Sequence, residues 1–194
     1  MGVDIVFPNA QHVYGIPEHA TDMSLKDTVG QAGGSYSEPY RLYNLDVFEY
    51  ELDVPMALYG SIPFMVGHGL KGTVGAFWFN PTETFIDVEK TSKGTKSHWI
   101  SEAGLFDLFL VPGPSPLKLY SQYAKLTGTT QLPPMFALGY HQCRWNYRDE
   151  ADVALVDGNF EEHNMPYDVL WLDIEHTKGK RYFTWDKNLF PEPK

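Results

Sequence analysis

The sequence lacks several features that would place it in a particular class of protein. Its single cysteine, Cys143, cannot form an intrachain disulfide, so the chain carries no redox signature of one compartment. The N-terminus has no basic region followed by a long apolar core, and no stretch reaches the ~18 apolar residues of a membrane span. The triplet Asn80-Pro81-Thr82 has proline where a glycosylation signal excludes it. We therefore expect any targeting signal to lie outside this chain, and we predict no membrane span within it.

Basic residues are also scarce. The 15 Lys and Arg residues are scattered among 25 Asp and Glu residues, which gives a formal net charge of -10. Because neutralising phosphates requires clustered Lys and Arg, this pattern excludes nucleic acid as a partner. With 43% apolar and 21% charged residues, the 194-residue chain has the composition of a packed globular protein. Aromatic residues make up 15% of it, which favours β-rich packing, with stacking on sugar rings as the alternative.

The first half of the chain has the pattern of an all-β domain. Short runs of β-branched and aromatic residues alternate with Gly, Pro, Asn and Asp, at a spacing typical of a β-sandwich. Two polar stretches, 31–35 and 91–97, are predicted to be loops. The strands that this pattern predicts cover residues 3–7, 40–52, 57–66, 73–79, 84–88 and 105–111.

A helix is predicted after this region. Ser115 is placed to cap its N-terminus, and Pro116 stands at the first helical position, where the missing N–H costs nothing. Gly128 suits the C-terminal end. The apolar residues that recur at helical spacing, and that we expect to face the core, are Leu117, Tyr120 and Ala124.

The last part of the chain has the pattern of a βαβ unit. Residues 135–140 and 167–172 are continuously apolar, as in strands that are buried on both faces of a parallel sheet. Asp149 opens a helix between them, with Val153, Val156 and Phe160 on its apolar face. Two parallel strands leave both sheet edges unpaired, so such a unit does not fold alone. We expect this segment to be the beginning of a larger α/β domain.

Two polar clusters follow the predicted parallel strands, where functional groups gather in such sheets. Residues 141–147 combine polar and aromatic side chains that suit a sugar ring, although packing of Trp145 against a neighbour is an equal alternative. In the second cluster, Asp173 and Glu175 project to one side of a strand end. A retaining glycosidase holds its two carboxyls ~5 to 5.5 Å apart across the bond, usually from separate strands. This favours hydroxyl binding by Asp173 over nucleophilic attack.

Other chemistries are weakly supported. His141, His163, His176 and Glu175 have no tight ligand spacing, so we expect no metal site. Cys143 fits a buried structural cysteine better than a reactive thiol. In the β half, residues 40–48 place polar groups among aromatics, and taken alone Arg41 and Asp46 have the pattern of a solvated strand face.

These stretches resemble one family. Val-Tyr-Gly-Ile-Pro-Glu-His at 13–19 and Trp-Leu-Asp-Ile-Glu-His at 171–176 are similar to motifs of the α-glucosidases of glycoside hydrolase family 31, in particular its glucosidase II and neutral α-glucosidase C branches. The similar stretches follow one another in order along the chain. The others are 40–48, 58–63, 75–78, 126–129, 138–147 and 179–185.

The resemblance implies both a fold and a set of binding residues. It implies a galactose-mutarotase-like β-sandwich in residues 1–112, a linking helix and loop in 113–134, and the start of a catalytic (β/α)₈ TIM barrel, truncated after its first βαβ part, in 135–194. By the family's pattern, Asp173 binds hydroxyls of the terminal glucose and Trp145 forms a wall of the same pocket. Asp46 reaches into that pocket from the sandwich.

The implied function is that of a fragment of a retaining, exo-acting α-glucosidase that removes terminal α-linked glucose from N-glycans or glucans. The family's Trp-x-Asp-Met-Asn-Glu-Pro nucleophile motif and its acid/base Asp are absent from this sequence. We therefore expect no catalytic residue, no cofactor and no activity in the isolated chain, whose ligand is an α-glucoside or glucosylated oligosaccharide. The glucosidase II branch implies a β subunit as partner and the lumen of the endoplasmic reticulum, with the cytoplasm as the other compartment. The alternative function is a non-catalytic carbohydrate-binding or interaction protein.

Overall fold

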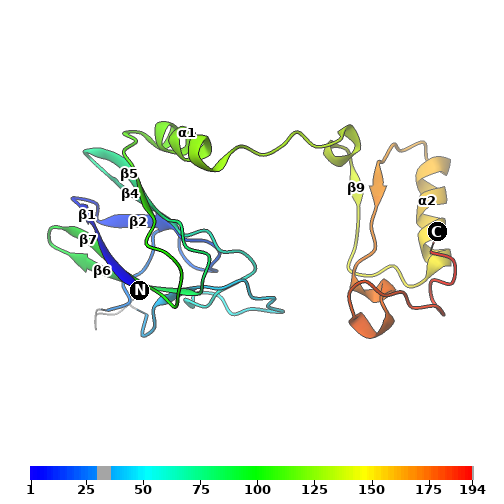
Figure 1. The fold of residues 1–194 in the computed structure, drawn as a ribbon. Helices are drawn as coiled ribbons and strands as arrows, with labels where there is room; N and C mark the ends of the chain where they lie inside the picture. Colours follow the sequence, from blue (N-terminus) through cyan, green and yellow to red (C-terminus); the bar gives the residue numbers. More distant parts are fainter. Residues whose placement is uncertain (30–35, 194) are drawn as a thin grey trace. The chain divides into compact units, whose positions relative to one another are not determined.

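The computed structural model describes residues 1–29 and 36–193 and divides the chain into two compact units (Figure 1). Unit 1 spans Met1–Thr129 and unit 2 spans Thr130–Lys194. The loop predicted at 31–35 lies outside the described residues. Neither of the two α-helices among the described residues has the length and apolarity needed to cross a bilayer.

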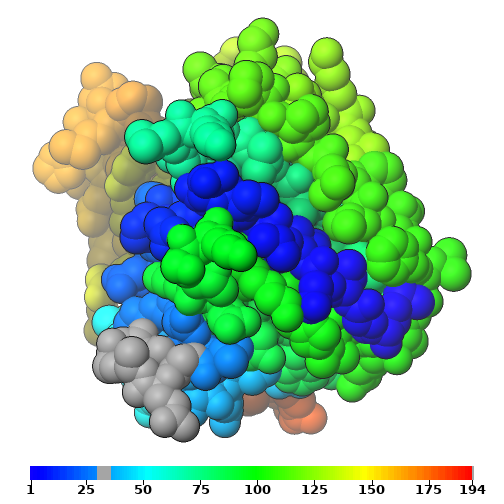
Figure 2. All heavy atoms as spheres, turned by 90° about the vertical axis from the view of Figure 1, so that its left-hand side faces the viewer, coloured from blue at the N-terminus to red at the C-terminus, as the bar shows by residue number. Residues whose placement is uncertain are grey.

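Unit 1 is a sandwich of two antiparallel four-stranded sheets, which confirms the predicted β-sandwich. Figure 2 shows β1, in dark blue, running beside green residues of the β6–β7 hairpin on one face of this unit. One sheet has the order β1 (Gly2–Pro8), β7 (Gly94–Ser101), β6 (Thr84–Thr91) and β3 (Tyr40–Leu42). The other has the order β2 (His12–Gly15), β4 (Phe64–Gly69), β5 (Gly72–Trp78) and β8 (Leu108–Val111).

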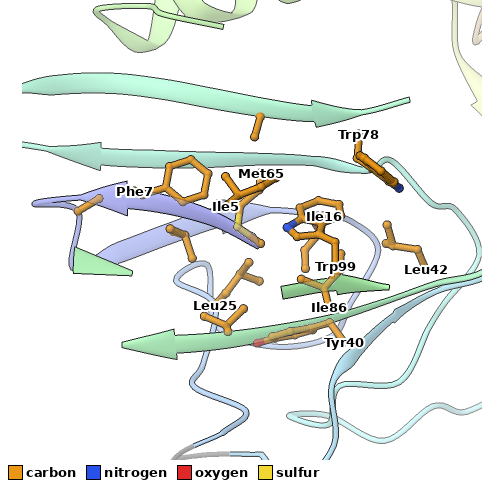
Figure 3. Packing of buried hydrophobic residues seen from close by; sticks show 14 residues of the cluster. Ile5, Phe7, Ile16, Leu25, Tyr40, Leu42, Met65, Trp78, Ile86 and Trp99 are labelled. Carbon is orange, nitrogen blue, oxygen red and sulfur yellow. The ribbon is translucent and has the colours of Figure 1, made fainter. Parts of the chain in front are cut away.

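The core between the sheets is built around two tryptophans (Figure 3). Trp78 and Trp99 are fully buried, and each indole N–H donates to a serine hydroxyl, of Ser101 and Ser97 respectively, at 2.9 Å. A buried tryptophan needs such a partner, because an unsatisfied N–H in the core costs free energy. The serines of β7 therefore let large aromatic rings pack in the interior.

Strand β7 occupies most of the segment 91–97 that was predicted to be a loop, so that prediction is wrong. Thr95 and Ser97 point into the core and are fully buried, and the Thr95 hydroxyl donates to the carbonyl of Ala10 at 2.8 Å. Their polarity hid the alternation of buried and exposed residues from a hydrophobic pattern. Only the tight turn between Thr91 and Gly94 remains of the predicted loop.

The predicted strand 40–52 is also wrong beyond its first three residues. β3 ends at Leu42, and Glu49 has a positive φ angle of 49°, which a continuous strand does not allow. Residues 43–59 instead form a long loop, which we call the Asp46 loop. Strand β4 accordingly starts at Phe64 and not at residue 57, and the short strand β2 had not been predicted.

Helix α1 (Pro116–Thr127) has the predicted ends but buries a different face. Ser115 accepts a hydrogen bond from the Lys118 amide, and the Gly128 amide closes the last turn. The predicted inward residues Leu117 and Tyr120 are exposed. Leu119 and Tyr123 pack on the sandwich, Tyr123 stacked on Phe64 with ring centroids 4.3 Å apart. The exposed Tyr120 ring adds only an edge contact to Phe64, at 6.2 Å.

Unit 2 contains the predicted helix and a parallel strand pair. Helix α2 (Glu150–Glu162) begins after Asp149, whose carboxylate accepts from the Asp152 amide at 2.8 Å, and β9 (His141–Gln142) pairs in parallel with β10 (Val169–Leu170). The strand predicted at 135–140 is wrong, because Met135–Leu138 forms a 3₁₀ turn and the pairing starts at His141. The predicted helix face is partly shielded, since Phe160 lies between Tyr140 and Tyr167.

Candidate functional site

The polar clusters of unit 2 meet beyond the carboxyl ends of β9 and β10. Parallel strands bring these ends to one edge of a sheet, so residues that follow the two strands lie near each other. The indole N–H of Trp145, after β9, donates to Glu175 Oε1, after β10, at 3.2 Å. This hydrogen bond joins the two sequence clusters into one candidate site.

Asp173 lies at the start of a 3₁₀ turn (Ile174–His176) and not on a strand end, as had been expected. Its Oδ1 accepts a hydrogen bond from the Ile174 amide at 2.6 Å, and the side chain is exposed. Because the turn begins between Asp173 and Glu175, the two carboxylates do not share a strand face. The hydrogen bond from the Ile174 amide fixes the Asp173 side chain while leaving it accessible to a ligand.

Glu175 is half-buried and engaged by two neighbours. Its Oε1 accepts from the Trp145 indole and lies 3.3 Å from the Lys180 ammonium. A carboxylate held in this way orients the tryptophan and is not a free partner for Asp173 in a catalytic pair. Lys180 was not singled out from the sequence, and its only signal was that 179–185 belongs to a stretch similar to the family.

Trp145 exposes more than half of its side chain, with 57% accessible, although its indole N–H is hydrogen bonded. The buried ring of the same loop is Tyr147, whose hydroxyl accepts from the Gln142 amide group at 3.1 Å. Tyr147 therefore anchors the loop, and the indole of Trp145 presents a ring surface of the kind that stacks on sugars.

The remaining candidates of this cluster make local contacts. His176 Nδ1 donates to the Asp173 carbonyl at 2.6 Å, which ties the 3₁₀ turn, and His141 Nε2 donates to the Ala137 carbonyl at 3.2 Å. Cys143 is exposed, so its predicted burial is wrong. Within residues 1–29 and 36–193, no group of three or more His, Cys, Asp or Glu side chains is arranged to hold a metal ion.

Asp46 belongs to unit 1 and is exposed on the Asp46 loop. Two hydrogen bonds, made by the residues on either side of Asp46, close the base of this loop. The Leu45 amide donates to the Leu58 carbonyl at 2.7 Å, and the Tyr59 hydroxyl donates to the Val47 carbonyl at 2.7 Å. Asp46 is thus presented from a narrow, cross-linked neck.

Arg41, expected to be solvated, is half-buried and paired. Its Nε lies 2.5 Å from Glu83 Oε1, and its guanidinium lies 4.4 Å from the centroid of the Tyr43 ring. The pair and the ring fix the chain at the point where β3 ends and the Asp46 loop begins.

A cavity of about 600 Å³ opens beside this point in unit 1. It mixes aromatic rings with polar groups, a combination that suits sugars. Burial raises the pKa of the Tyr123 hydroxyl in its wall, which keeps that group protonated and able to donate. The sequence signalled this region only by the polar groups among aromatics at 40–48. The lining of the cavity includes Tyr43, Asn44, Phe77, Phe79, Glu83 and Tyr123.

Two family descriptions match the chain. The model for the glycosyl hydrolase 31 N-terminal galactose mutarotase-like domain matches residues 1–87, and that for the glycosyl hydrolases family 31 TIM-barrel domain matches residues 130–194. These matches confirm the predicted fold class, a galactose-mutarotase-like sandwich followed by the start of a TIM barrel.

Known proteins are similar to this chain over all or nearly all of its length. Neutral alpha-glucosidase AB of Dictyostelium discoideum is 59% identical over 197 residues, covering 100% of this chain and 21% of that relative. A glucosidase II alpha subunit solved with alpha3-Glc2 bound is 52% identical, with a TM-score of 0.85. The match covers 99% of this chain and 22% of that subunit. A solved ER glucosidase II heterodimeric complex of the catalytic subunit and the binding domain of the regulatory subunit is 53% identical, with a TM-score of 0.84 and the same coverage. The chain therefore spans about a fifth of the length of these proteins.

Proposed function

Because this chain belongs to glycoside hydrolase family 31, we propose that it is the part of a retaining, exo-acting α-glucosidase that supplies one wall of the glucose-binding pocket. The observation that carries the proposal is the hydrogen bond from Trp145 to Glu175, which attaches an exposed indole to the turn that the exposed Asp173 begins, beyond two parallel strands. An aromatic face and an acceptor carboxylate are what a terminal glucose needs for stacking and hydroxyl recognition.

Each residue has a distinct role in this proposal. Asp173 accepts hydrogen bonds from glucose hydroxyls, while the hydrogen bond from the Ile174 amide keeps its carboxylate in place. Trp145 provides the wall against which the ring packs, and Glu175 with Lys180 orients the indole. Asp46 adds a second acceptor from the sandwich. No catalytic role is assigned to any of them.

We further propose that the isolated chain does not hydrolyse glycosides. Retention requires two carboxyls ~5 to 5.5 Å apart, one of which attacks while the other transfers the proton. Asp173 and Glu175 do not form such a pair, because Glu175 is ion-paired with Lys180 and hydrogen-bonded to Trp145. The nucleophile motif of the family is absent from the sequence.

The substrate and partner follow the glucosidase II relatives. The alpha3-Glc2-bound glucosidase II alpha subunit supports an α-linked glucose oligosaccharide, such as a glucosylated N-glycan, as the substrate. The heterodimeric ER complex supports a regulatory β subunit as the partner and the lumen of the endoplasmic reticulum as the compartment.

The test uses a chimera in which residues 1–194 replace the matching segment of the Dictyostelium neutral alpha-glucosidase AB. Asp173→Asn, Trp145→Ala and Asp46→Asn are expected to lower kcat/KM for an α-glucoside by about tenfold or more each, since each removes a hydrogen bond to a charged group or a stacking ring. The control is Asp4→Asn, which removes an exposed carboxylate on β1, paired with Lys96 and His98. An active chimera whose three variants all keep full kcat/KM would contradict the assigned roles.

A further inference from the structure

The Asp46 loop, residues 43–59, has little core of its own. Only Ala57 and Leu58 are buried in it, whereas Phe48, next to the neck, and Leu52, near the far end, are more than two thirds exposed. The two hydrogen bonds at its neck fix Leu45 and Val47, but they leave the far end to be held by other contacts. A loop of this length with few buried side chains is otherwise free to move.

The far end of the loop is held by the carboxylate of Asp53. Its Oδ2 lies 2.6 Å from the Lys26 ammonium, which also contacts Oδ1. Oδ1 accepts further hydrogen bonds from the Tyr36 hydroxyl at 2.8 Å and the Thr21 hydroxyl at 3.3 Å. The Asp53 amide donates to the carbonyl of Ala20 at 2.6 Å.

This cluster is connected to the core. The Lys26 amide donates to the hydroxyl of Tyr40 at 2.8 Å, and Tyr40 is fully buried on β3. The side chain of Lys26 is only 19% exposed, so its ammonium depends on the carboxylate that faces it. Asp22, 3.9 Å away, is a more distant second anion. A base connected to the core therefore holds the loop through the carboxylate and the backbone amide of Asp53.

We propose that Asp53 is a positioning residue for Asp46: by clamping the far end of the Asp46 loop to Lys26 and Tyr36, it fixes the orientation in which Asp46 meets the substrate. The part of this inference that concerns substrate rests on the proposed function, whereas the clamp itself does not. Asp53 lies seven residues after Asp46 and acts only through the loop.

The clamp is tested first by hydrogen exchange of the 1–194 chain at neutral pH. Asp53→Asn is the sharpest variant, because asparagine tolerates the positive φ of 61° as well as aspartate does, so that only the charge is lost. The exchange of the backbone amides of residues 45 and 53 is expected to become about 3- to 10-fold faster, as the loss of a surface ion pair and its hydrogen bonds implies. Tyr36→Phe, which keeps the ion pair, is expected to give a smaller acceleration.

Asp4→Asn is the matched control, since Asp4 also joins a lysine and a second donor, Lys96 and His98, but on strands remote in sequence from the loop. It is expected to leave the loop amides within about twofold of the parent. An unchanged loop in Asp53→Asn overturns the clamp. So does an equal acceleration of the β6–β7 amides, because that indicates a loss of global stability.

The consequence for substrate is tested in the chimera. Asp53→Asn is expected to raise KM about 3- to 10-fold with kcat within about twofold, the pattern of lost ground-state and transition-state binding alike. A normal KM in an active chimera in which Asp46→Asn is impaired overturns the positioning role and leaves the proposed function standing. An inactive chimera contradicts the proposed function, and the exchange data then decide the clamp alone.

Discussion

The two units differ in how many buried hydrophobic residues each contains. Unit 1 buries a fourteen-residue cluster around Trp78 and Trp99, and α1 adds a second cluster through Leu119. In the described part of unit 2, Tyr147 and Phe190 are the only buried hydrophobic residues, and α2 has none. Both units have regular elements, so the difference is one of packing.

The difference follows from the two architectures. The two sheets of a sandwich cover each other, and residues 1–111 supply both. A strand of a parallel barrel needs strands on both sides and helices outside, and β9 and β10 pair over only two residues each. Unit 1 therefore has the contacts of an independently stable body, whereas the sheet edge of unit 2 that carries the candidate site has few buried side chains to support it.

The largest expected effect comes from removing a core tryptophan. Trp99→Ala is expected to lower the free energy of unfolding of unit 1 by about 3 to 5 kcal/mol, because the ring is fully buried and leaves Ser97 without its donor. Trp145→Ala in unit 2 is expected to change stability by less than about 0.5 kcal/mol, since that indole is mostly exposed. Denaturant unfolding followed by far-UV circular dichroism measures both, and equal effects would remove the contrast.

A glycine substitution tests the tight packing of the sandwich. Gly15 has φ of 104°, and a Cβ placed there would lie 2.3 Å from the carbonyl oxygen of Phe64. Gly15→Ala is expected to destabilise unit 1 by about 1 to 3 kcal/mol through backbone strain. A thermal melting midpoint equal to that of the parent would count against this packing.

The opposite sign is expected for a glycine in unit 2. Gly158 lies in the interior of α2, and nothing lies within 4 Å of a Cβ added there. Gly158→Ala is expected to stabilise the helix by about 0.5 to 1 kcal/mol, because alanine loses less backbone entropy. Slower amide exchange within 150–162 checks this, and faster exchange would show that the site is more crowded than the structure indicates.

The smallest effect concerns pH. Hydrogen bonds from the Lys26 ammonium and then from the Tyr36 hydroxyl hold the pKa of Asp53 below its ordinary value. Because the folded pKa is the lower one, the clamp's contribution is full above the ordinary pKa of an aspartate and is lost as the pH falls through the folded value. Asp22 is the other carboxylate near Lys26. Carboxyl ¹³C NMR should show Asp53 titrating below a free aspartate, and an unshifted midpoint would contradict the contact.

Much of the fold could be predicted from the sequence, because local signals for helix ends and strands agreed with the structure. Ser115, Pro116 and Gly128 define α1, and Asp149 defines the start of α2. Strand β7 was missed because Thr95 and Ser97 are buried hydroxyls, which a hydrophobic pattern treats as exposed. The inner face of α1 was wrong because the helix carries apolar residues on more than one side, and the sheet that it packs on selects Leu119 and Tyr123.

Part of the candidate site could also be predicted from the sequence, and part could not. Trp145 and Asp173 could be placed after parallel strands from the pattern alone, but the engagement of Glu175 by Lys180 depends on how a 3₁₀ turn folds. The clamp on the Asp46 loop had no sequence signal, because Lys26 and Asp53 are separated by 27 residues and neither lies in a regular element. Such contacts are fixed by tertiary structure.

The most direct test of the central claim is to compare the isolated chain with the chimera on an α-glucoside, following the anomer of the released glucose by ¹H NMR. We expect the chimera to release α-glucose first, which indicates retention, and the 1–194 chain at equal concentration to release none. Release of glucose by the isolated chain, or an initial release of β-glucose by the chimera, would contradict it.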